Sequence, residues 1–209
     1  MEKFTTLRTA AAPLLQENID TDTIIPMAKM VGVSVRGSLG QWCLAPLRYL
    51  PDGSENPAFV LNRAPYRGSQ ILLTGPNFGC GSSRETAVWA LEEIGIRCVI
   101  GSSFGDIFFN NCFQNGVLPV VVDREVVNEL AAEVEARQGA ATIGVDLEGG
   151  VITAPSGKTH PFTVQENRKE ALLLGLDEIG QTLRHDAAIS AFQARDRLAR
   201  PWIYEAGEA

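Results

Sequence analysis

Short apolar runs separated by glycine predict alternating strands and helices in the middle of the chain. The runs at 70–74, 96–100 and 118–122 have the length and composition of buried strands. Between them, apolar residues recur with a helical period after Ser82, and a second helix is indicated over 106–115. Three strands joined by two helices at this spacing predict a parallel βαβαβ centre with right-handed crossovers.

The chain beyond this centre predicts an antiparallel part of the sheet. Residues 124–137 have the pattern of an amphipathic helix. Segments 142–147 and 151–154 flank a Gly-Gly pair typical of a hairpin, and 159–164 indicates a third strand. The sequence therefore predicts a mixed sheet rather than a purely parallel one.

The remaining segments are less regular. Residues 3–15 are weakly patterned, whereas 32–68 are rich in Gly, Pro and Ser, which indicates long loops around short elements. Helical pattern returns over 167–175 and 186–199.

Length and composition agree with one α/β domain over 1–209, in which 165–209 forms a helical tail. Of 209 side chains, 45% are hydrophobic and 21% are charged, which is typical of a globular protein and excludes disorder of the whole chain. No apolar run approaches the roughly 18 residues of a membrane helix, and the N-terminus lacks the apolar region of a secretion signal. The net charge is −7 and the basic residues are scattered, so neither a membrane nor a nucleic acid is an expected partner. We therefore expect a soluble cytoplasmic protein.

Cysteine and histidine are too sparse and dispersed to build a metal site locally. The four cysteines include no C-x-x-C pair, and zinc or iron–sulfur ligands usually come in closer sets. Free thiols are therefore expected, with Cys80 and Cys112 more simply interpreted as buried than as reactive. His160 and His185 lie in peripheral segments and are given no role. We expect this chain to bind no cofactor itself.

The strongest candidate site is Gly-Cys-Gly-Ser-Ser-Arg-Glu at 79–85, between a predicted strand and a predicted helix. Glycine permits sharp turns and the close approach of a ligand. The first N–H groups of a helix lack internal partners and carry the positive end of its dipole, to which Arg84 adds a cation. Two interpretations stay open: a site for carboxylate or phosphate, or a capping box in which Glu85 completes a serine N-cap.

A serine hydroxyl at such a junction could act as a base. Backbone amides and the Arg84 cation favour its charged form, so Ser82 could take a proton in a dehydration. The alternative is a stand-alone hydrolase with Ser82 or Cys80 as nucleophile, which requires a distant histidine to fold onto this segment.

Two further features carry weaker signals. The carboxylates of Asp20 and Asp22 could bind a metal ion, pair with an arginine or stabilise a turn. Arg36 lies in the loop region, where it is either a solvated charge or a group that recognises a carboxylate through two parallel hydrogen bonds.

A third segment is aromatic. The three phenylalanines of the predicted helix at 106–115 are expected to pack in the core, and Asn115-Gly116 to end that helix. Asn110 and Asn111 are unusual inside a helix and indicate polar contacts.

Three motifs together resemble a known family. Asn-Ile-Asp-Thr-Asp-Thr-Ile-Ile-Pro (18–26), Gly-Pro-Asn-Phe-Gly-Cys-Gly-Ser-Ser-Arg-Glu (75–85) and Phe-Gly-Asp-Ile-Phe-Phe-Asn-Asn-Cys (104–112) occur in this order. Their order and spacing resemble the small subunit of 3-isopropylmalate dehydratase, of the aconitase superfamily, and the similarity extends to the tail at 192–204.

The resemblance implies a swivelling β/β/α domain that pairs with a separate large subunit, which holds a [4Fe-4S] cluster. In that family, 2-isopropylmalate, a small dicarboxylate, is dehydrated to isopropylmaleate and rehydrated to 3-isopropylmalate in leucine biosynthesis. By motif position, Ser82 resembles the proton-abstracting base and Asp22 an orienting catalytic carboxylate. Ser83, Arg84 and Arg36 resemble groups that bind the substrate.

Two departures from the family pattern keep alternatives open. The family usually has His where this chain has Thr86, and residues 31–39 differ from the shorter basic loops of the family. The small subunit of a related hydro-lyase, homoaconitase-like or dimethylmalate dehydratase-like, is one alternative. A non-catalytic module that binds a dicarboxylate is the other.

Overall fold

The computed structural model describes residues 1–30, 36–137 and 141–204, and it divides into two compact units, Met1–Gly175 and Leu176–Ala209. The strands of the first unit are β1 (Thr6–Leu14), β2 (Ile71–Thr74), β3 (Cys98–Gly101), β4 (Leu118–Val121), β5 (Thr142–Asp146), β6 (Val151–Thr153) and β7 (Thr159–Pro161). Its α-helices are α1 (Thr21–Ile24), α2 (Ala45–Arg48), α3 (Glu85–Glu93), α4 (Asp106–Gln114), α5 (Arg124–Ala136) and α6 (Glu166–Leu174). Short 3-10 helices in the loops are η1 (Met27–Lys29), η2 (Gly40–Trp42), η3 (Val60–Asn62) and η4 (Ala64–Tyr66). The interpretation of 1–209 as one domain with a tail from residue 165 stays a prediction.

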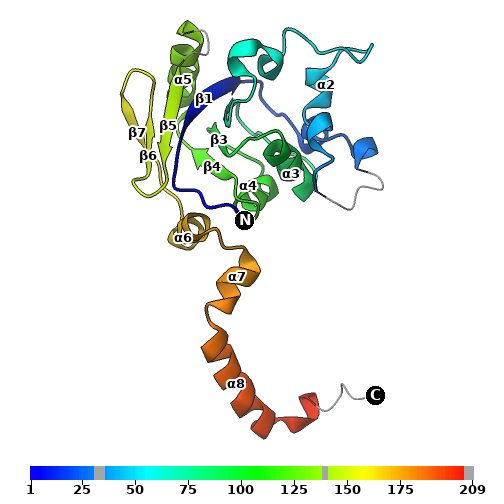
Figure 1. Ribbon diagram of the computed structural model, residues 1–209, viewed down its shortest axis with the longest axis vertical. Coiled ribbons are helices and arrows are strands. Elements are labelled where there is room, and N and C mark those ends of the chain that lie inside the picture. The colour runs from blue at the N-terminus through cyan, green and yellow to red at the C-terminus, as the bar shows by residue number, and fades with distance from the viewer. Residues whose placement is uncertain (31–35, 138–140, 205–209) are drawn as a thin grey trace. The chain divides into compact units, whose positions relative to one another are not determined.

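The strands form one seven-stranded mixed sheet in the order β4-β3-β2-β1-β5-β6-β7 (Figure 1). Strands β1 to β4 pair in parallel, while β5, β6 and β7 continue the sheet from β1 in antiparallel fashion. The predicted α/β class, the parallel βαβαβ centre and the antiparallel hairpin are confirmed.

Strand β1, which lies in the weakly patterned stretch at 3–15, joins the two parts of the sheet. Residues Thr6–Ala10 pair with β5, whereas Ala11–Leu14 pair with β2. Each half of the strand therefore has a different neighbour and a different pattern of burial. Three consecutive alanines, which are depleted in strands generally, weaken the signal further.

The core surrounds the parallel strands. Every residue of β2 and β3 is buried, as expected for a parallel sheet covered on both faces. Helix α5 packs across β1, β2 and β3, and α3 packs against α4 (Figure 1). The N-terminal segment is fixed by a hydrogen bond from the Phe4 N–H to the Leu172 carbonyl oxygen of α6, at 2.9 Å.

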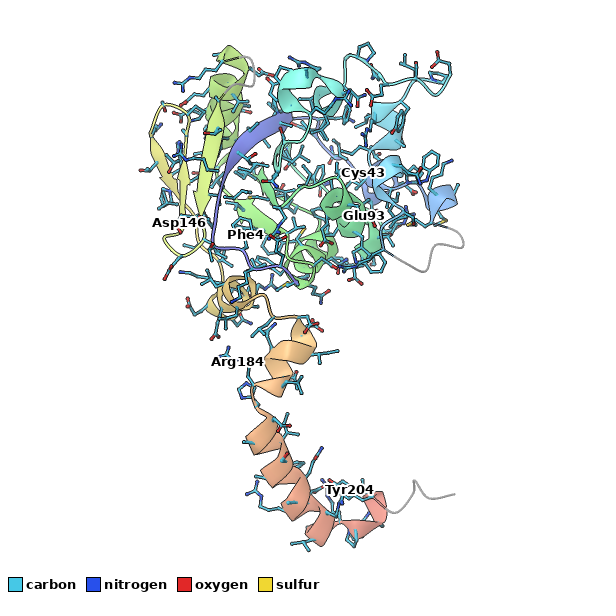
Figure 2. All side chains as sticks on the ribbon, viewed as in Figure 1. Phe4, Cys43, Glu93, Asp146, Arg184 and Tyr204 are labelled. Carbon is cyan, nitrogen blue, oxygen red and sulfur yellow. The ribbon has the colours of Figure 1, made fainter. Side chains whose placement is uncertain are left out.

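The second unit contains α7 (Glu178–Leu183), α8 (Asp186–Ala199) and η5 (Pro201–Ile203). Helix α7 is not indicated by the apolar pattern. It begins at an N-cap, where the Asp177 carboxylate accepts a hydrogen bond from the Gly180 N–H at 2.7 Å. After η5, the Tyr204 hydroxyl donates to Asp196 of α8 at 2.8 Å. Figure 2 labels Tyr204. None of the helices in the described ranges has the length and apolar character needed to cross a bilayer.

Gly79 offers a test of how tightly the loop after β2 packs. Its φ angle is +74°, and an added Cβ would lie 2.2 Å from Cγ of Phe108. Gly53 also has a positive φ, +84°, but an added Cβ there meets nothing within 4 Å. The two positions therefore separate backbone strain from overpacking.

We predict that Gly53→Ala costs about 1–2 kcal/mol, which is the strain of left-handed backbone alone. Gly79→Ala should cost roughly a further 1–3 kcal/mol, because Phe108 must move in a packed core. Urea unfolding of the two variants measures the difference. Equal losses of stability would show that Phe108 does not constrain the loop.

Candidate active site

The candidate site lies where three loops continue the sheet beyond the carboxyl ends of β1, β2 and β3. The Gly79 N–H donates to the Ile19 carbonyl oxygen at 2.7 Å, and the Gly105 N–H donates to the Phe78 carbonyl oxygen at 2.9 Å. A Cβ at position 105 would lie 2.5 Å from the Gly79 carbonyl oxygen, so a glycine is needed there. The loop after β2 is thus fixed between its two neighbours, at the edge where open α/β sheets bind ligands.

Thr21 fixes the backbone of Ser82. The Thr21 N–H donates to the Cys80 carbonyl oxygen at 2.9 Å. Its hydroxyl accepts from the Ser82 N–H and donates to the Ser82 carbonyl oxygen, both at 3.1 Å. The sequence pattern does not reveal this role of Thr21, because the carboxylates on either side of it carry the more obvious signal.

The Ser82 side chain is exposed and borders an open pocket of about 350 Å³. The pocket is lined by Asn77, Gly79, Cys80, Gly81, Ser82, Phe104, Gly105, Asp106 and Ile107. The corner that carries the Ser-Ser-Arg motif is therefore reachable from outside the fold.

The start of α3 provides unpaired backbone donors. Arg84 occupies the N-cap position and no side chain caps the helix. In the described part of the chain, the N–H groups of Ser83, Glu85 and Thr86 have no hydrogen-bond acceptor. The capping-box interpretation is wrong, since the Glu85 carboxylate instead accepts from Asn115 at 3.0 Å. The helix terminus remains available to an anion.

Asp22 and Arg84 form the central ion pair of the site. Arg84 Nη1 and Nη2 donate to the two Asp22 carboxylate oxygens at 2.5 and 3.0 Å, and Nη1 also approaches the Ile25 carbonyl oxygen at 3.4 Å. The Arg84 side chain is 8% exposed, whereas that of Asp22 is 57% exposed. The hydrogen bond from Arg84 is the main cause that holds the pKa of Asp22 below its ordinary value, against a smaller opposing effect of desolvation.

The two carboxylates of the Asp-Thr-Asp motif have different partners and different roles. Asp20 stabilises the turn: its carboxylate accepts from the Thr23 N–H at 2.7 Å and caps the one-turn helix α1. Asp22 pairs with the arginine. Two of the three interpretations of this motif therefore hold, one for each carboxylate.

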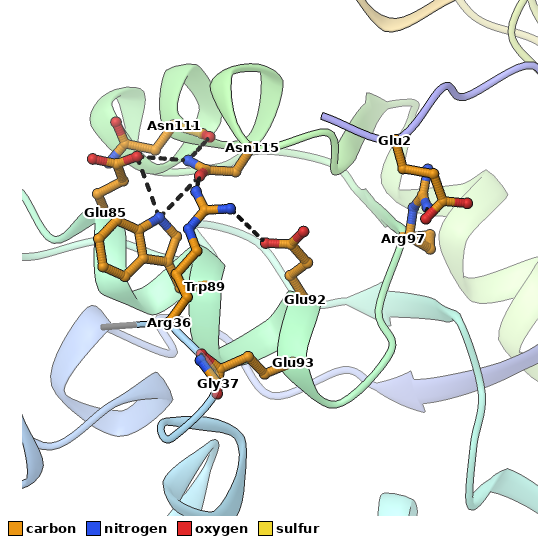
Figure 3. A network of polar contacts seen from close by, with 10 residues as sticks. All are labelled: Glu2, Arg36, Gly37, Glu85, Trp89, Glu92, Glu93, Arg97, Asn111 and Asn115. Atoms are coloured by element: carbon orange, nitrogen blue, oxygen red, sulfur yellow. Dashed lines mark hydrogen bonds and ion pairs between the residues drawn. The ribbon is translucent and has the colours of Figure 1, made fainter. Parts of the chain in front are cut away.

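Arg36 does not contact Asp22 or Arg84 but belongs to a network with Asn115, Trp89 and Glu92, which Figure 3 shows. Its guanidinium donates to Asn115, approaches Glu92 at 3.4 Å and stands over the Trp89 ring, 4.8 Å from the ring centre. The proposed role of Arg36 in substrate binding stays a prediction.

Thr86 stands where the sequence comparison by motif expects His. It contacts Met30, at the start of the loop that leads to Arg36. Its hydroxyl donates to the Met30 sulfur at 2.8 Å. Through this hydrogen bond, the first turn of α3 contacts the residue that precedes the loop at 31–35. The part of the loop at 31–35 that differs from the family lies outside the described residues.

The thiols and histidines of the first unit do not assemble a metal site. Burial raises the pKa of the thiols of Cys43, Cys98 and Cys112, which keeps them protonated. Cys80 is only half-buried and lines the pocket, so the expectation of a buried thiol is wrong there. In the described ranges, no group of three or more His, Cys, Asp or Glu side chains could hold a metal ion. His160 lies in β7, at the far edge of the sheet, where a hydrolase mechanism at Ser82 could not use it.

Family models of known proteins match most of the chain. A family model described as aconitase C-terminal domain matches residues 1–125, and one described as LeuD_N matches 128–166. A third, described as the C-terminal domain of the 3-isopropylmalate dehydratase small subunit, matches 178–206. The fold and these family models define the class: an aconitase-type hydro-lyase domain.

Similar sequences identify the family within that class. The chain is 53% identical over 203 residues to a 3-isopropylmalate dehydratase small subunit from Gluconacetobacter diazotrophicus, covering 97% of each chain. It is 50% identical to that of Afipia carboxidovorans, covering 97% of this chain and 100% of the relative. The chain belongs to the family of 3-isopropylmalate dehydratase small subunits.

A solved structure supports the fold. The 3-isopropylmalate dehydratase (LeuD) of Methanocaldococcus jannaschii superposes with a TM-score of 0.64 at 22% identity, covering 89% of this chain and 98% of that one. The swivelling-domain fold implied by the sequence motifs is confirmed.

The ion pair predicts a dependence of stability on pH. A carboxylate whose pKa is lowered on folding stabilises the folded chain above its ordinary pKa of about 3.9, and this contribution is lost as the pH falls through the lower folded value. Asp22→Asn should therefore lower the melting temperature by a few degrees at pH 7, and the difference from the unmodified chain should shrink below about pH 3.

Asp52→Asn is the matched control, because the exposed Asp52 has its pKa lowered by hydrogen bonds from the neutral Ser54. Added salt should weaken the effect of Asp22→Asn but not that of Asp52→Asn. A loss at Asp22 that is independent of both pH and salt would show that the pair does not act electrostatically.

Proposed function

We propose that this chain is the small subunit of a two-subunit hydro-lyase that interconverts 2-isopropylmalate and 3-isopropylmalate through isopropylmaleate, in the cytoplasm. The observation that carries the proposal is the exposed Ser82 at an open helix terminus beside a buried arginine. The family supports the substrate and the place in leucine biosynthesis. The geometry supports the separate roles that are proposed below for Ser82, for Ser83 and Arg84, and for Asp22.

Ser82 is proposed as the group that moves the proton. Thr21 fixes its backbone from both sides, so the hydroxyl starts from a defined position at the pocket. Unpaired amides of the first turn of α3 and the Arg84 cation stabilise negative charge at this corner. A hydroxyl held here can take the C–H proton in dehydration and return it in rehydration.

Ser83 and Arg84 are proposed to bind a carboxylate of the substrate. Two N–H groups of Arg84, on Nε and Nη2, have no acceptor among the described residues, while the others donate to the Asp22 carboxylate and to the Ile25 carbonyl oxygen. Ser83 is exposed, and its unpaired N–H lies in the same turn. Asp22 orients the guanidinium and balances its charge until a substrate carboxylate joins it.

The [4Fe-4S] cluster of the reaction is proposed to belong to the large subunit. The donor set of this chain does not fit such a cluster, since three of its thiols are buried and protonated and the fourth stands alone at the pocket. The chemistry of the cluster therefore belongs to that subunit. In this proposal the exposed corner around Ser82 meets the large subunit and completes the pocket.

We predict that Ser82→Ala, combined with the large subunit, leaves assembly intact and lowers turnover by about 10²–10⁴-fold, the contribution of a positioned acid–base group. Turnover of 2-isopropylmalate and size-exclusion chromatography of the complex are the measurements. Ser54→Ala is the control, because Ser54 is another exposed serine in a turn, whose hydroxyl donates to Asp52. Near-normal turnover of Ser82→Ala would remove this residue from the mechanism.

A further inference from the structure

Asn115 is a buried amide with every hydrogen-bonding position filled. Its Nδ2 donates to the Glu85 carboxylate at 3.0 Å and to the Asn111 carbonyl oxygen at 2.8 Å. Its Oδ1 accepts from Trp89 Nε1 at 2.9 Å and from Arg36 Nη2 (Figure 3). The side chain has two donors and two acceptor positions, so all four are used and its orientation is fixed. The sequence indicates this residue only as the end of a helix.

Arg36 is held by this amide without being buried. Its guanidinium stands over the Trp89 ring, and its side chain is 49% exposed. The Nη1 atom approaches Glu92 at 3.4 Å, a long contact. Three of its five N–H groups have no acceptor in the described part of the chain. A guanidinium fixed on one edge and open on another is preorganised for an anion.

The backbone next to Arg36 is fixed by the same helix. The carboxylate of Glu93, at the end of α3, accepts hydrogen bonds from the N–H groups of Gly37, Leu39 and Gly40 at 2.6, 2.6 and 2.7 Å. One carboxylate thus anchors the loop backbone at three positions. Both the backbone and the head group of the arginine are therefore held by contacts to α3 and its surroundings.

Helix α3 also carries the other arginine. Arg84 immediately precedes Glu85, whose carboxylate contacts both Asn115 and Trp89. With a rise of about 1.5 Å per residue, Trp89 lies only about 6 Å along the helix from Glu85. A rigid helix therefore sets the distance between Arg84 and the Trp89 ring, over which Arg36 stands.

We propose that Asn115, supported by Trp89 and Glu93, is a positioning residue that holds Arg36 as the second carboxylate-binding cation of the site. A dicarboxylate substrate would then meet two arginines whose separation is set by α3, with Arg84 at its start and Arg36 beside Trp89. This inference rests on the proposed function, because it takes Arg36 to bind the substrate.

The test is the kinetics of Asn115→Leu in the complex reconstituted with the large subunit. Loss of the amide should raise KM for 2-isopropylmalate about tenfold and leave kcat within about twofold, because Arg36 binds substrate and transition state alike. Asn110→Leu is the control in α4, the helix that Asn115 caps, since Asn110 accepts from a different arginine, Arg168, at 2.7 Å. Its KM should not change, and an equal rise in both variants would overturn the inference.

A double-mutant cycle with Arg36→Ala separates positioning from general destabilisation. If Asn115 acts through Arg36, the double variant should have the KM of Arg36→Ala alone, whereas additive effects would overturn the inference. Should Asn115→Leu fail to fold, Trp89→Phe removes the Nε1–H that donates to Asn115 and keeps an aromatic ring beside Arg36. A raised KM is expected there too, and an unchanged KM would contradict the proposal.

The failure of this inference is distinguishable from failure of the proposed function. An unchanged KM in Arg36→Ala, with turnover still lost in Ser82→Ala, would overturn the role of Arg36 and Asn115 alone. Normal turnover in Ser82→Ala would overturn the proposed mechanism instead.

Discussion

The site depends on backbone hydrogen bonds that join three loops after the parallel strands have ended. Gly79 pairs with Ile19 on one side, and Phe78 pairs with Gly105 on the other. These contacts fix the direction in which the chain leaves β2, and with it the start of α3. Side chains could be exchanged along this edge, but a displaced loop would move the Ser-Ser-Arg turn as a whole. The glycines are needed because neighbouring backbone and Phe108 fill the space that a side chain would occupy.

The electrostatics of the site follow from the burial of one cation. Arg84 is almost fully buried and would be costly to keep without a partner, so Asp22 supplies a carboxylate in the absence of substrate. The carboxylate itself is exposed, which allows it to adjust when another anion approaches. A buried arginine with an exposed partner thus keeps the helix terminus positive without leaving an unpaired charge inside the fold.

The parts that the sequence could predict are those whose signal is local. Strands β2, β3 and β4 are continuous apolar runs because a parallel sheet is covered on both faces, and the junction at 79–85 is marked by glycine. Strand β1 could not be predicted from the sequence pattern, because its two halves pair with different strands. The roles of Thr21 and Asn115 could not be predicted for a related reason: each has decisive partners far away in the chain, Ser82 for Thr21 and Trp89 for Asn115, and no local pattern reveals such contacts.

Helix α3 positions most of the groups that the proposed reaction uses. Its first turn provides amides and Arg84, its middle supports Arg36 through Trp89, and its last residue anchors the adjoining loop. A substrate with two carboxylates needs two cations at a fixed separation, and a helix maintains a separation better than loops do. Because Ser82 precedes the same helix, the proposed proton-moving group and both proposed carboxylate-binding arginines are positioned by a single rigid element. A domain that carries its groups in this way can approach a partner as a rigid body and keep their mutual geometry unchanged.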